Sequence, residues 1–370
     1  MRIAQLVHTL NYGDAISGEA LAIRRILSEQ GIDNRIFSLH AHEKVTSDRF
    51  PLAELADYVH SAREIGSETT RAEKVVVILH YSLASPLNEA YLALENAHRV
   101  IIYHNLTPPR WFAGYNARVH ADLVAGEQEL PQLLSASDEV IADSHFNARE
   151  LEHYGCDSAQ VLGLLIDLRK WSVEANPGIR DALLGHGGRN FLHVGRTAPN
   201  KCLEDIIKAF YFYYHKIDRQ SRLWLIGSDI DTEIYSFELS RLVTELRLKE
   251  AVNFVGSVSD GELRSFYENS DVYLAMSEHE GFCVPLLEAM HFNLPIIAFD
   301  SSAVGETLGD AGYLIGEKDY PRIAELMSQI VSRSELVQAA RERGQERLKF
   351  FSEAKFRSEL GVLLQKWSGL

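Results

Sequence analysis

The 370-residue sequence has few cysteines, no long apolar run and no excess of positive charge. Cys156, Cys202 and Cys283 are far apart and odd in number, which argues against a disulfide scaffold and fits a reducing compartment. No apolar stretch approaches the ~20 residues that a membrane span requires, and the first residues are too often interrupted by polar ones for a signal peptide. We therefore expect a cytoplasmic protein that could associate peripherally with the inner face of a membrane.

Lysine and arginine number 37 against 52 aspartates and glutamates, so the formal charge is −15. Nucleic-acid binding requires a basic face, and we expect no nucleic-acid partner. The sequence contains neither a Walker-type glycine loop nor a G-x-G-x-x-G fingerprint. No cluster of histidine and cysteine has the spacing of a zinc site, so the sequence predicts no bound metal.

Short apolar runs rich in β-formers alternate with longer amphipathic segments, in two rounds. The runs lie at residues 3–7, 34–39, 75–79, 100–103 and 139–142, and then at 190–194, 222–226, 252–255, 272–275 and 295–299. This alternation predicts an α/β protein of two doubly wound, Rossmann-like domains, each a parallel sheet with helices on both faces.

A polar stretch with proline and glycine, 174–189, separates the two rounds. We therefore place the first domain at 1–168 and the second at 169–351. The tail from 334 has the pattern of one or two charged amphipathic helices. Its last helix, about 352–370, is predicted to cross back to the first domain.

Ligands of such sheets bind at the carboxyl ends of the strands. Three predicted strands of the first domain end in histidine: His8, His80 and His104. If all three point into one crevice, His104 is our choice for contacting a ligand, and a buried structural role is preferred for the other two. Asp14 either caps the following helix or contacts a ligand. The crevices of the two domains, if they face each other, would form one cleft.

In the second domain, Arg196 and Lys201 follow the predicted strand 190–194 and precede a helix. A guanidinium fork and a lysine point charge at a strand end suit a diphosphate. The alternative is a surface ion pair with Glu204 or Asp205.

A second constellation lies at 280–288. Pro285 is typical of the first turn of a helix, so the backbone N–H groups of 282–284 would face an anion. Glu288, one turn into that helix, would accept hydrogen bonds from ribose hydroxyls, and Glu280 would lie toward a sugar. The alternative for Glu288 is a charge favoured by the helix dipole.

These constellations resemble the retaining nucleotide-sugar glycosyltransferases of family 4, which have the GT-B fold, and in particular a branch that builds bacterial polysaccharides and glycolipids. The resemblance is strongest over 190–315, where Glu280 and Glu288 have the spacing of the family's E-x7-E motif. It implies catalytic roles for Glu280, His104, Arg196 and Lys201. It implies substrate contacts for Gly13, Asp14, Gly256, Val258, Leu263, Gly281, Phe282, Cys283, Val284 and Glu288.

Two positions depart from the family pattern. Tyr12-Gly13-Asp14 stands where many members have a Gly-Gly loop, and Cys283 stands where glycine is common. The first departure changes the loop that would contact the acceptor and the phosphate, whereas a backbone contact at the small Cys283 should survive.

The resemblance implies transfer of a hexosyl unit, with retention, from an NDP-sugar to a saccharide or lipid-linked saccharide acceptor. UDP is favoured over GDP. The first domain would bind the acceptor and the second the nucleotide sugar. Arg196, Lys201 and a helix terminus would stabilise the diphosphate in place of Mg²⁺, so no cofactor is expected. The alternatives are a nucleotide-sugar 2-epimerase of the same architecture and a non-catalytic nucleotide-sugar-binding subunit.

Overall fold

The computed structural model describes residues 1–64, 74–166 and 168–369, and the chain divides into two compact units. The first unit comprises Met1–Pro108, Ala121–Asp167 and Phe351–Leu370, and the second comprises Pro109–His120 and Leu168–Phe350. Residues 109–120, which the sequence analysis placed in the first domain, thus group with the second unit. Within the described ranges, no helix combines the length and the apolar character needed to cross a membrane.

The first unit contains a seven-stranded parallel sheet of order β3-β2-β1-β4-β5-β6-β7. Its strands are β1 (Arg2–Leu10), β2 (Asp33–Ala41), β3 (Arg49–Pro51), β4 (Val75–Tyr81), β5 (His98–Tyr103), β6 (Glu139–Ala142) and β7 (Gln160–Val161). β1 pairs with β2 on one side and with β4 on the other, so the chain changes direction across the sheet between β1 and β4. Strands β3 and β7 were not predicted, because two or three residues leave no apolar run in a sequence.

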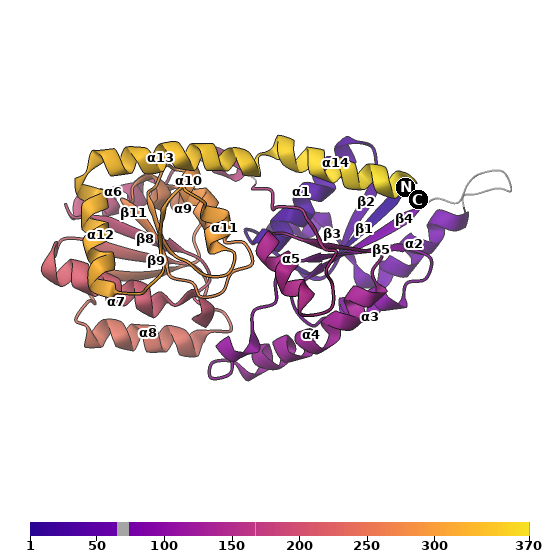
Figure 1. Cartoon of the computed structure of the whole chain (residues 1–370), viewed down its shortest axis with the longest axis horizontal. Helices are drawn as coiled ribbons and strands as arrows, with labels where there is room; N and C mark the ends of the chain where they lie inside the picture. Colours follow the sequence, from indigo (N-terminus) through magenta and orange to yellow (C-terminus); the bar gives the residue numbers. More distant parts are fainter. Residues whose placement is uncertain (65–73, 167, 370) are drawn as a thin grey trace. The chain divides into compact units, whose positions relative to one another are not determined.

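Helices cover both faces of this sheet (Figure 1). They are α1 (Ala15–Glu29), α2 (Leu55–Glu64), α3 (Pro86–Ala93), α4 (Ala117–Ala136), α5 (His145–Glu152) and α14 (Glu353–Gly369). Helix α14 packs on the first unit as predicted. Phe356, Leu360 and Leu364 recur at helical spacing and lie in one core with Ile3 and Ile23.

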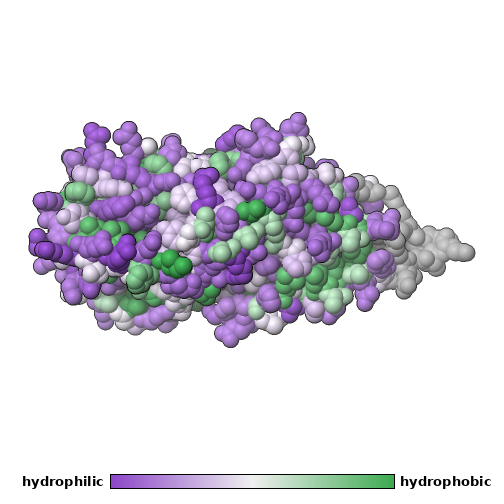
Figure 2. All heavy atoms as spheres, turned by 90° about the horizontal axis from the view of Figure 1, so that it is seen from below, coloured by the Kyte–Doolittle hydropathy of each residue, from purple (hydrophilic) through white to green (hydrophobic). Residues whose placement is uncertain are grey.

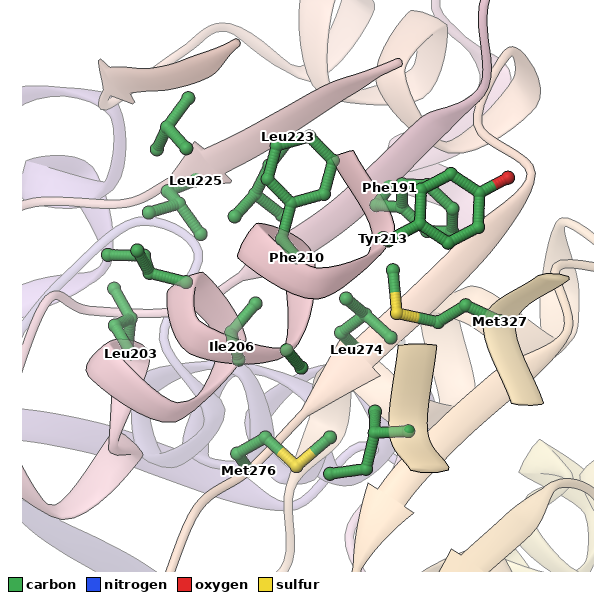
Figure 3. Close-up of a cluster of buried hydrophobic side chains, with 14 of the residues drawn as sticks. Phe191, Leu203, Ile206, Phe210, Tyr213, Leu223, Leu225, Leu274, Met276 and Met327 are labelled. Carbon is green, nitrogen blue, oxygen red and sulfur yellow. The ribbon is translucent and has the colours of Figure 1, made fainter. Parts of the chain in front are cut away.

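The second unit contains a six-stranded parallel sheet of order β10-β9-β8-β11-β12-β13. Its strands are β8 (Asn190–Val194), β9 (Arg222–Ile226), β10 (Val252–Gly256), β11 (Val272–Ala275), β12 (Ile296–Phe299) and β13 (Tyr313–Ile315). One core cluster lies between this sheet and helix α7; Figure 3 shows Phe191 and Leu223 of the sheet against Ile206 and Phe210 of α7. Both sheets are parallel and doubly wound, which confirms the predicted fold class.

One helix of the second unit lies inside the stretch 174–189, which separates the two rounds of strands in the sequence. The helices of this unit are α6 (Pro177–Gly185), α7 (Leu203–Lys216), α8 (Glu233–Glu245), α9 (Asp260–Glu268), α10 (Val284–His291), α11 (Val304–Leu308), α12 (Tyr320–Ser332) and α13 (Ser334–Leu348). Asn176 caps α6 by accepting hydrogen bonds from the N–H groups of Gly178 and Ile179. An Asn-Pro pair can start a helix as well as a turn, so the stretch that separates the two rounds of strands also holds a helix. The face drawn in Figure 2 is mostly hydrophilic, with apolar side chains scattered among the polar ones.

Candidate active site

The main polar site of the second unit lies where β8 and β11 are neighbours and the strand order reverses. Lys201 ends the short 3-10 turn that follows β8, and Glu280 follows β11. Lys201 Nζ donates to both carboxylate oxygens of Glu280, at 2.6 Å each. The two side chains are 21% and 9% exposed. Such a reversal is where open α/β sheets bind their ligands.

The close approach of two strand ends fixes the loop that carries Lys201. Gly195 N–H donates to Ile226 O at 2.9 Å, directly before Gly227 (φ +149°). A Cβ atom on Gly227 would lie 1.9 Å from Gly195 O, so only glycine fits there. Gly227 N–H in turn donates to Gly256 O at 3.0 Å, which joins the ends of β8, β9 and β10.

The charges of Lys201 and Glu280 support each other. Burial alone would raise the pKa of Glu280, but Lys201 outweighs it and the pKa lies below its usual value. Burial likewise opposes the charge on Lys201, yet Glu280 holds the pKa of that lysine above its usual value. The site therefore carries an ionised pair at neutral pH.

Arg196 does not join that pair. It is exposed, and its Nη2 donates to Ile230 O at 2.7 Å. The ion pair with Glu204 or Asp205, which the sequence left open for Arg196 and Lys201, is not formed. Lys201 is bonded to Glu280, and Arg196 lies on a strand end with its guanidinium accessible to a ligand.

The loop that follows Glu280 leads into α10, which confirms the predicted helix start at Pro285. Cys283 occupies the N-cap position with φ 73° and ψ 62°, and its side chain makes no capping hydrogen bond. This left-handed conformation favours glycine, which explains why glycine is common there in the family that the sequence resembles. The positive end of α10 and the pair Lys201–Glu280 together suit an anion beside a polar group.

Glu288 is buried in α10, where Tyr267 Oη donates to its Oε2 at 2.8 Å and Lys170 bonds its Oε1. It is therefore more than an exposed charge at a helix N-terminus. Its predicted contact with ribose stays a prediction, as do the substrate contacts of Gly281, Phe282 and Val284.

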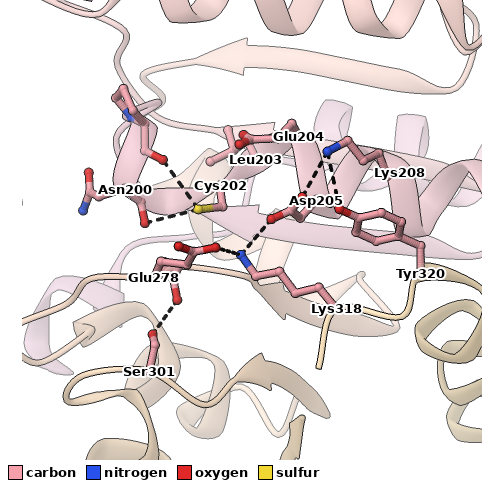
Figure 4. A network of polar contacts seen from close by, with 12 residues as sticks. Asn200, Cys202, Leu203, Glu204, Asp205, Lys208, Glu278, Ser301, Lys318 and Tyr320 are labelled. Atoms are coloured by element: carbon pink, nitrogen blue, oxygen red, sulfur yellow. Dashed lines mark hydrogen bonds and ion pairs between the residues drawn. The ribbon is translucent and has the colours of Figure 1, made fainter. Parts of the chain in front are cut away.

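An ionic network holds the loop after β11 in place (Figure 4). Lys318 Nζ donates to Asp205 Oδ2 and to Glu278 Oε1, at 2.7 Å each. Tyr320 Oη also donates to Asp205, at 2.7 Å. Because Asp205 lies in α7 and Glu278 lies two residues before Glu280, the network links the helix that follows Lys201 to the loop that carries its partner.

The predicted base-binding residues run from the end of β10 into α9: Gly256 ends the strand, Val258 follows it, and Leu263 lies in the helix. Gly256 has φ +77°, and Val258 and Leu263 are half-buried after it. Gly256 lies at the same edge of the sheet as Gly195 and Gly227, to which the backbone hydrogen bonds join it. The contact of Gly256, Val258 and Leu263 with a base stays a prediction.

In the first unit, two of the three predicted histidines meet. His80 Nδ1 and His104 Nε2 are hydrogen-bonded at 2.9 Å. His8 instead contacts Ser85 Oγ at 2.9 Å, because β1 continues to Leu10 and His8 is not at a strand end. Burial lowers the pKa of His104 to about 3, so this imidazole is neutral. The side chain of His104 is turned into the unit, and its predicted contact with a sugar stays a prediction.

Asp14 accepts a hydrogen bond from Ser17 N–H at 2.7 Å and caps α1. This confirms one of the two roles considered for it. Gly13, beside it, has φ +90° and is exposed.

Residues 179–347 match the family model described as "Glycosyl transferases group 1". The matched range lies within the second unit. Lys201, Glu280 and Glu288 fall inside the matched range, whereas the histidines of the first unit fall outside it.

Solved structures share the fold over the whole chain. The chain is similar to HepE from Anabaena, solved with UDP and glucose, with a TM-score of 0.74 and 16% identity over 99% of this chain and 100% of that chain. It is also similar to sucrose-phosphate synthase from Thermosynechococcus elongatus, with a TM-score of 0.74 and 17% identity over 100% of this chain and 99% of that one. These likenesses establish the GT-B fold.

Curated relatives match mostly in part. The O-antigen chain mannosyltransferase RfbU of Salmonella typhimurium is 30% identical over 129 residues, 35% of either chain. An uncharacterized glycosyltransferase of Methanocaldococcus jannaschii is 25% identical over 303 residues, 80% of this chain and 77% of that one. The matched part thus spans about a third of RfbU and most of the archaeal protein.

The second unit also contains polar residues that the sequence analysis missed. Lys170 and Tyr267 hold Glu288, and Ser302 Oγ accepts from Glu280 N–H at 2.8 Å. His193 is buried with Nδ1 bonded to Leu274 O at 2.8 Å, and Nε2 has no hydrogen-bond partner among the described residues. His193 could have been found from its place near the end of a predicted strand, but the others carry no local signal.

Proposed function

We propose that this protein is a retaining glycosyltransferase of family 4. In this proposal it transfers a hexosyl unit from an NDP-sugar, with UDP favoured over GDP, to a saccharide or lipid-linked saccharide during polysaccharide biosynthesis. The observation that carries the proposal is the buried pair Lys201–Glu280 at the strand reversal of the unit that matches the model "Glycosyl transferases group 1". HepE bound to UDP-glucose and the O-antigen mannosyltransferase RfbU support the substrate classes.

The diphosphate is the group that this site would stabilise. Negative charge grows on it as the bond to the sugar breaks, and fixed positive groups stabilise that change most effectively. The ammonium group of Lys201 has three N–H donors. Two of them bond the carboxylate of Glu280 at 2.6 Å each, so the third can donate to a phosphate oxygen. Arg196 and the N-terminus of α10 add positive potential. The proposal places no metal on the diphosphate.

The two glutamates would then bind on either side of the diphosphate. Glu280, ionised beside Lys201, accepts hydrogen bonds from sugar hydroxyls. Glu288, oriented by Tyr267 and Lys170, accepts hydrogen bonds from ribose hydroxyls. The first unit would bind the acceptor.

The test has two steps. Thermal-shift measurements with UDP, GDP and ADP should show one preferred diphosphate that raises the unfolding midpoint, because a ligand that binds only the folded state stabilises it. NMR of the product made from the matching NDP-sugar and an oligosaccharide acceptor should then show retained anomeric configuration. Inversion of the anomeric centre would refute the proposed stereochemistry.

Donor incubated without acceptor separates the alternatives. Slow release of NDP supports a transferase, and an epimerised nucleotide sugar would identify an epimerase. Nucleotide binding without turnover in an acceptor library would indicate a binding subunit. Near-normal turnover in each of Arg196→Ala, Lys201→Ala and Glu280→Ala would overturn the assignment of the site.

A further inference from the structure

A second polar cluster is closed inside the first unit, away from the family match. Glu19 comes from α1, His80 from β4, and His104 from the residue after β5. Their side chains are 0%, 0% and 1% exposed. His80 Nδ1 lies 2.9 Å from His104 Nε2, and Glu19 Oε2 lies 3.4 Å from His104 Nε2 and 3.8 Å from His80 Nδ1. Three metal-ligating atoms thus converge on one point.

The carboxylate of this cluster lacks the partners that a buried polar group needs. Neither oxygen of Glu19 has a hydrogen-bond partner among the residues that the structure describes. A buried carboxyl group without such partners destabilises a folded protein. A cation at the convergence point would satisfy it, because one oxygen already faces both imidazole nitrogens.

The hydrogen bonds around His80 fix which of its nitrogens carries the proton. Gln5 Nε2 donates to Ala20 O at 3.1 Å, so the amide oxygen of Gln5 faces His80. His80 Nε2–H donates to that oxygen at 3.0 Å. A neutral His80 therefore presents the lone pair of Nδ1 to the cluster.

His104 cannot satisfy both of its neighbours with one proton. A proton on Nε2 serves His80 but leaves the Nδ1 lone pair 3.4 Å from the carboxylate oxygen of Asp143. A proton on Nδ1 suits Asp143 but sets two lone pairs 2.9 Å apart, at His80 and His104. A cation between those lone pairs removes the conflict. A carboxylate or amide behind each ligating histidine is the usual outer shell of a metal site.

The ligand types select the ion. Two imidazoles and one carboxylate form a common three-residue zinc set, whereas Ca²⁺ and Mg²⁺ prefer oxygen ligands. Bonds of ~2.1 Å at tetrahedral angles place ligand atoms ~3.4 Å apart. The three separations of 2.9, 3.4 and 3.8 Å bracket that value.

We propose that Glu19, His80 and His104 bind one Zn²⁺ ion that ties α1 to the ends of β4 and β5. In this assignment His104 Nε2 is a zinc ligand, which replaces the sugar contact that the sequence predicted. The proposal does not depend on the proposed transferase activity.

The experiment measures metal in the full chain, purified without an affinity tag and dialysed against a weak chelator. Mass spectrometry of the metals should find close to one zinc per chain. The near-isosteric variant Glu19→Gln should retain less than about half of it, and His80→Gln should retain less than one-tenth, since each loses a ligand. The matched control His8→Gln changes a histidine of the same sheet outside the cluster and should keep the full content.

A second measurement decides the matter if the variants fail to fold. Wild-type chain refolded from urea with a chelator and then given Zn²⁺ should unfold at a midpoint about 5 °C higher than the chelated sample. Refolding with Co²⁺ should give the visible absorption of a low-coordinate cobalt site with nitrogen and oxygen ligands. Less than one zinc per ten wild-type chains, with no shift of the midpoint, would overturn the proposal. The three side chains would then interact only through shared protons. A loss of transfer with normal zinc content would count against the proposed function only.

Discussion

A buried glutamate lies near the strand reversal of each sheet, and the two carboxyl groups are in opposite states. In the second unit, Lys201 faces Glu280, and the pKa of Glu280 lies below its usual value despite burial. In the first unit, burial, reinforced by Asp143, raises the pKa of Glu19 well above the usual value. The same fold thus builds one charged site and one that stays neutral unless a cation binds. Whether a buried carboxyl group is charged or neutral therefore depends on the cation nearest to it.

Removal of Lys201 should have the largest effect on this comparison, because it makes the second site resemble the first. Lys201→Ala leaves Glu280 buried without its cation and removes the donor that we propose for the diphosphate. We expect kcat for transfer to fall by about 10²–10³-fold. Lys216→Ala, which removes an exposed lysine at the end of the same helix α7, should stay within about threefold of wild type. Equal losses in both variants would show that charge in general, and not this pair, matters.

Gly227→Ala tests the backbone that positions the charged site. The added Cβ would lie 1.9 Å from Gly195 O, at a φ of +149°. We expect a loss of about 3 kcal/mol or more in the free energy of unfolding, together with loss of nucleotide binding. Gly316→Ala is the control, since no atom lies within 4 Å of its added Cβ. Calorimetry and nucleotide titration measure both outcomes, and a stable Gly227→Ala protein would contradict the close approach.

Matched amide substitutions compare the two glutamates directly. Glu280→Gln should cost about 2 kcal/mol of unfolding free energy, because Lys201 keeps its charge and loses its partner while water screens it only partly. Glu19→Gln should change stability by less than about 1 kcal/mol in chelator-treated protein, because an amide replaces an acid that burial keeps neutral. Urea unfolding measures both. A large cost for Glu19→Gln without zinc would mean that the carboxyl group is ionised in the metal-free state.

Acid should weaken the charged site first. Because the pKa of Glu280 is depressed, its ionisation contributes stability above the unfolded value of 4.5 and loses it as the pH falls through the lower folded value. The stability difference between wild type and Glu280→Gln should therefore be constant from pH 6 to about pH 8 and shrink below about pH 4.5. Urea midpoints at a series of pH values test this. A difference that persists unchanged to pH 3 would show that Glu280 is not held by Lys201.

The sequence predicted the charged site better than the neutral one. Lys201 and Glu280 lie in the loops that follow apolar runs identified as strands, and each belongs to a compact motif. The residues of the neutral cluster stand at positions 19, 80 and 104, on three separate elements, and no spacing pattern connects them. Only the pairing of β1 with β4 and of β4 with β5 brings them together. Two of the histidines were noticed at strand ends, but Glu19 inside a helix gave no signal.

In the fold, too, elements with a local sequence pattern were predicted, and those that depend on tertiary contacts were not. Short apolar runs identified the central strands. The amphipathic pattern of the tail identified helix α14, which packs on the first unit through Phe356, Leu360 and Leu364. The edge strands β3, β7 and β13 were missed, because so few residues carry no periodicity. Residues 109–120 group with the second unit through tertiary contacts such as Asn116 Nδ2 to Asp231 O at 2.9 Å, which no local pattern encodes.

The smallest effect is expected at Cys283, beside the charged site. Its φ of 73° is unfavourable for a side chain by about 1 kcal/mol, and glycine would relieve that cost. Glycine also loses more backbone entropy on folding, by roughly 0.5–1 kcal/mol, and removes a buried thiol. Cys283→Gly should therefore change the free energy of unfolding by less than about 1 kcal/mol and leave transfer within about threefold. Cys283→Val, with a β-branched side chain in the left-handed region, should unfold at a lower temperature than either. Equal melting of the valine and glycine variants would mean that the N-cap of α10 does not keep its left-handed conformation, and that the anion site at this helix is not preformed.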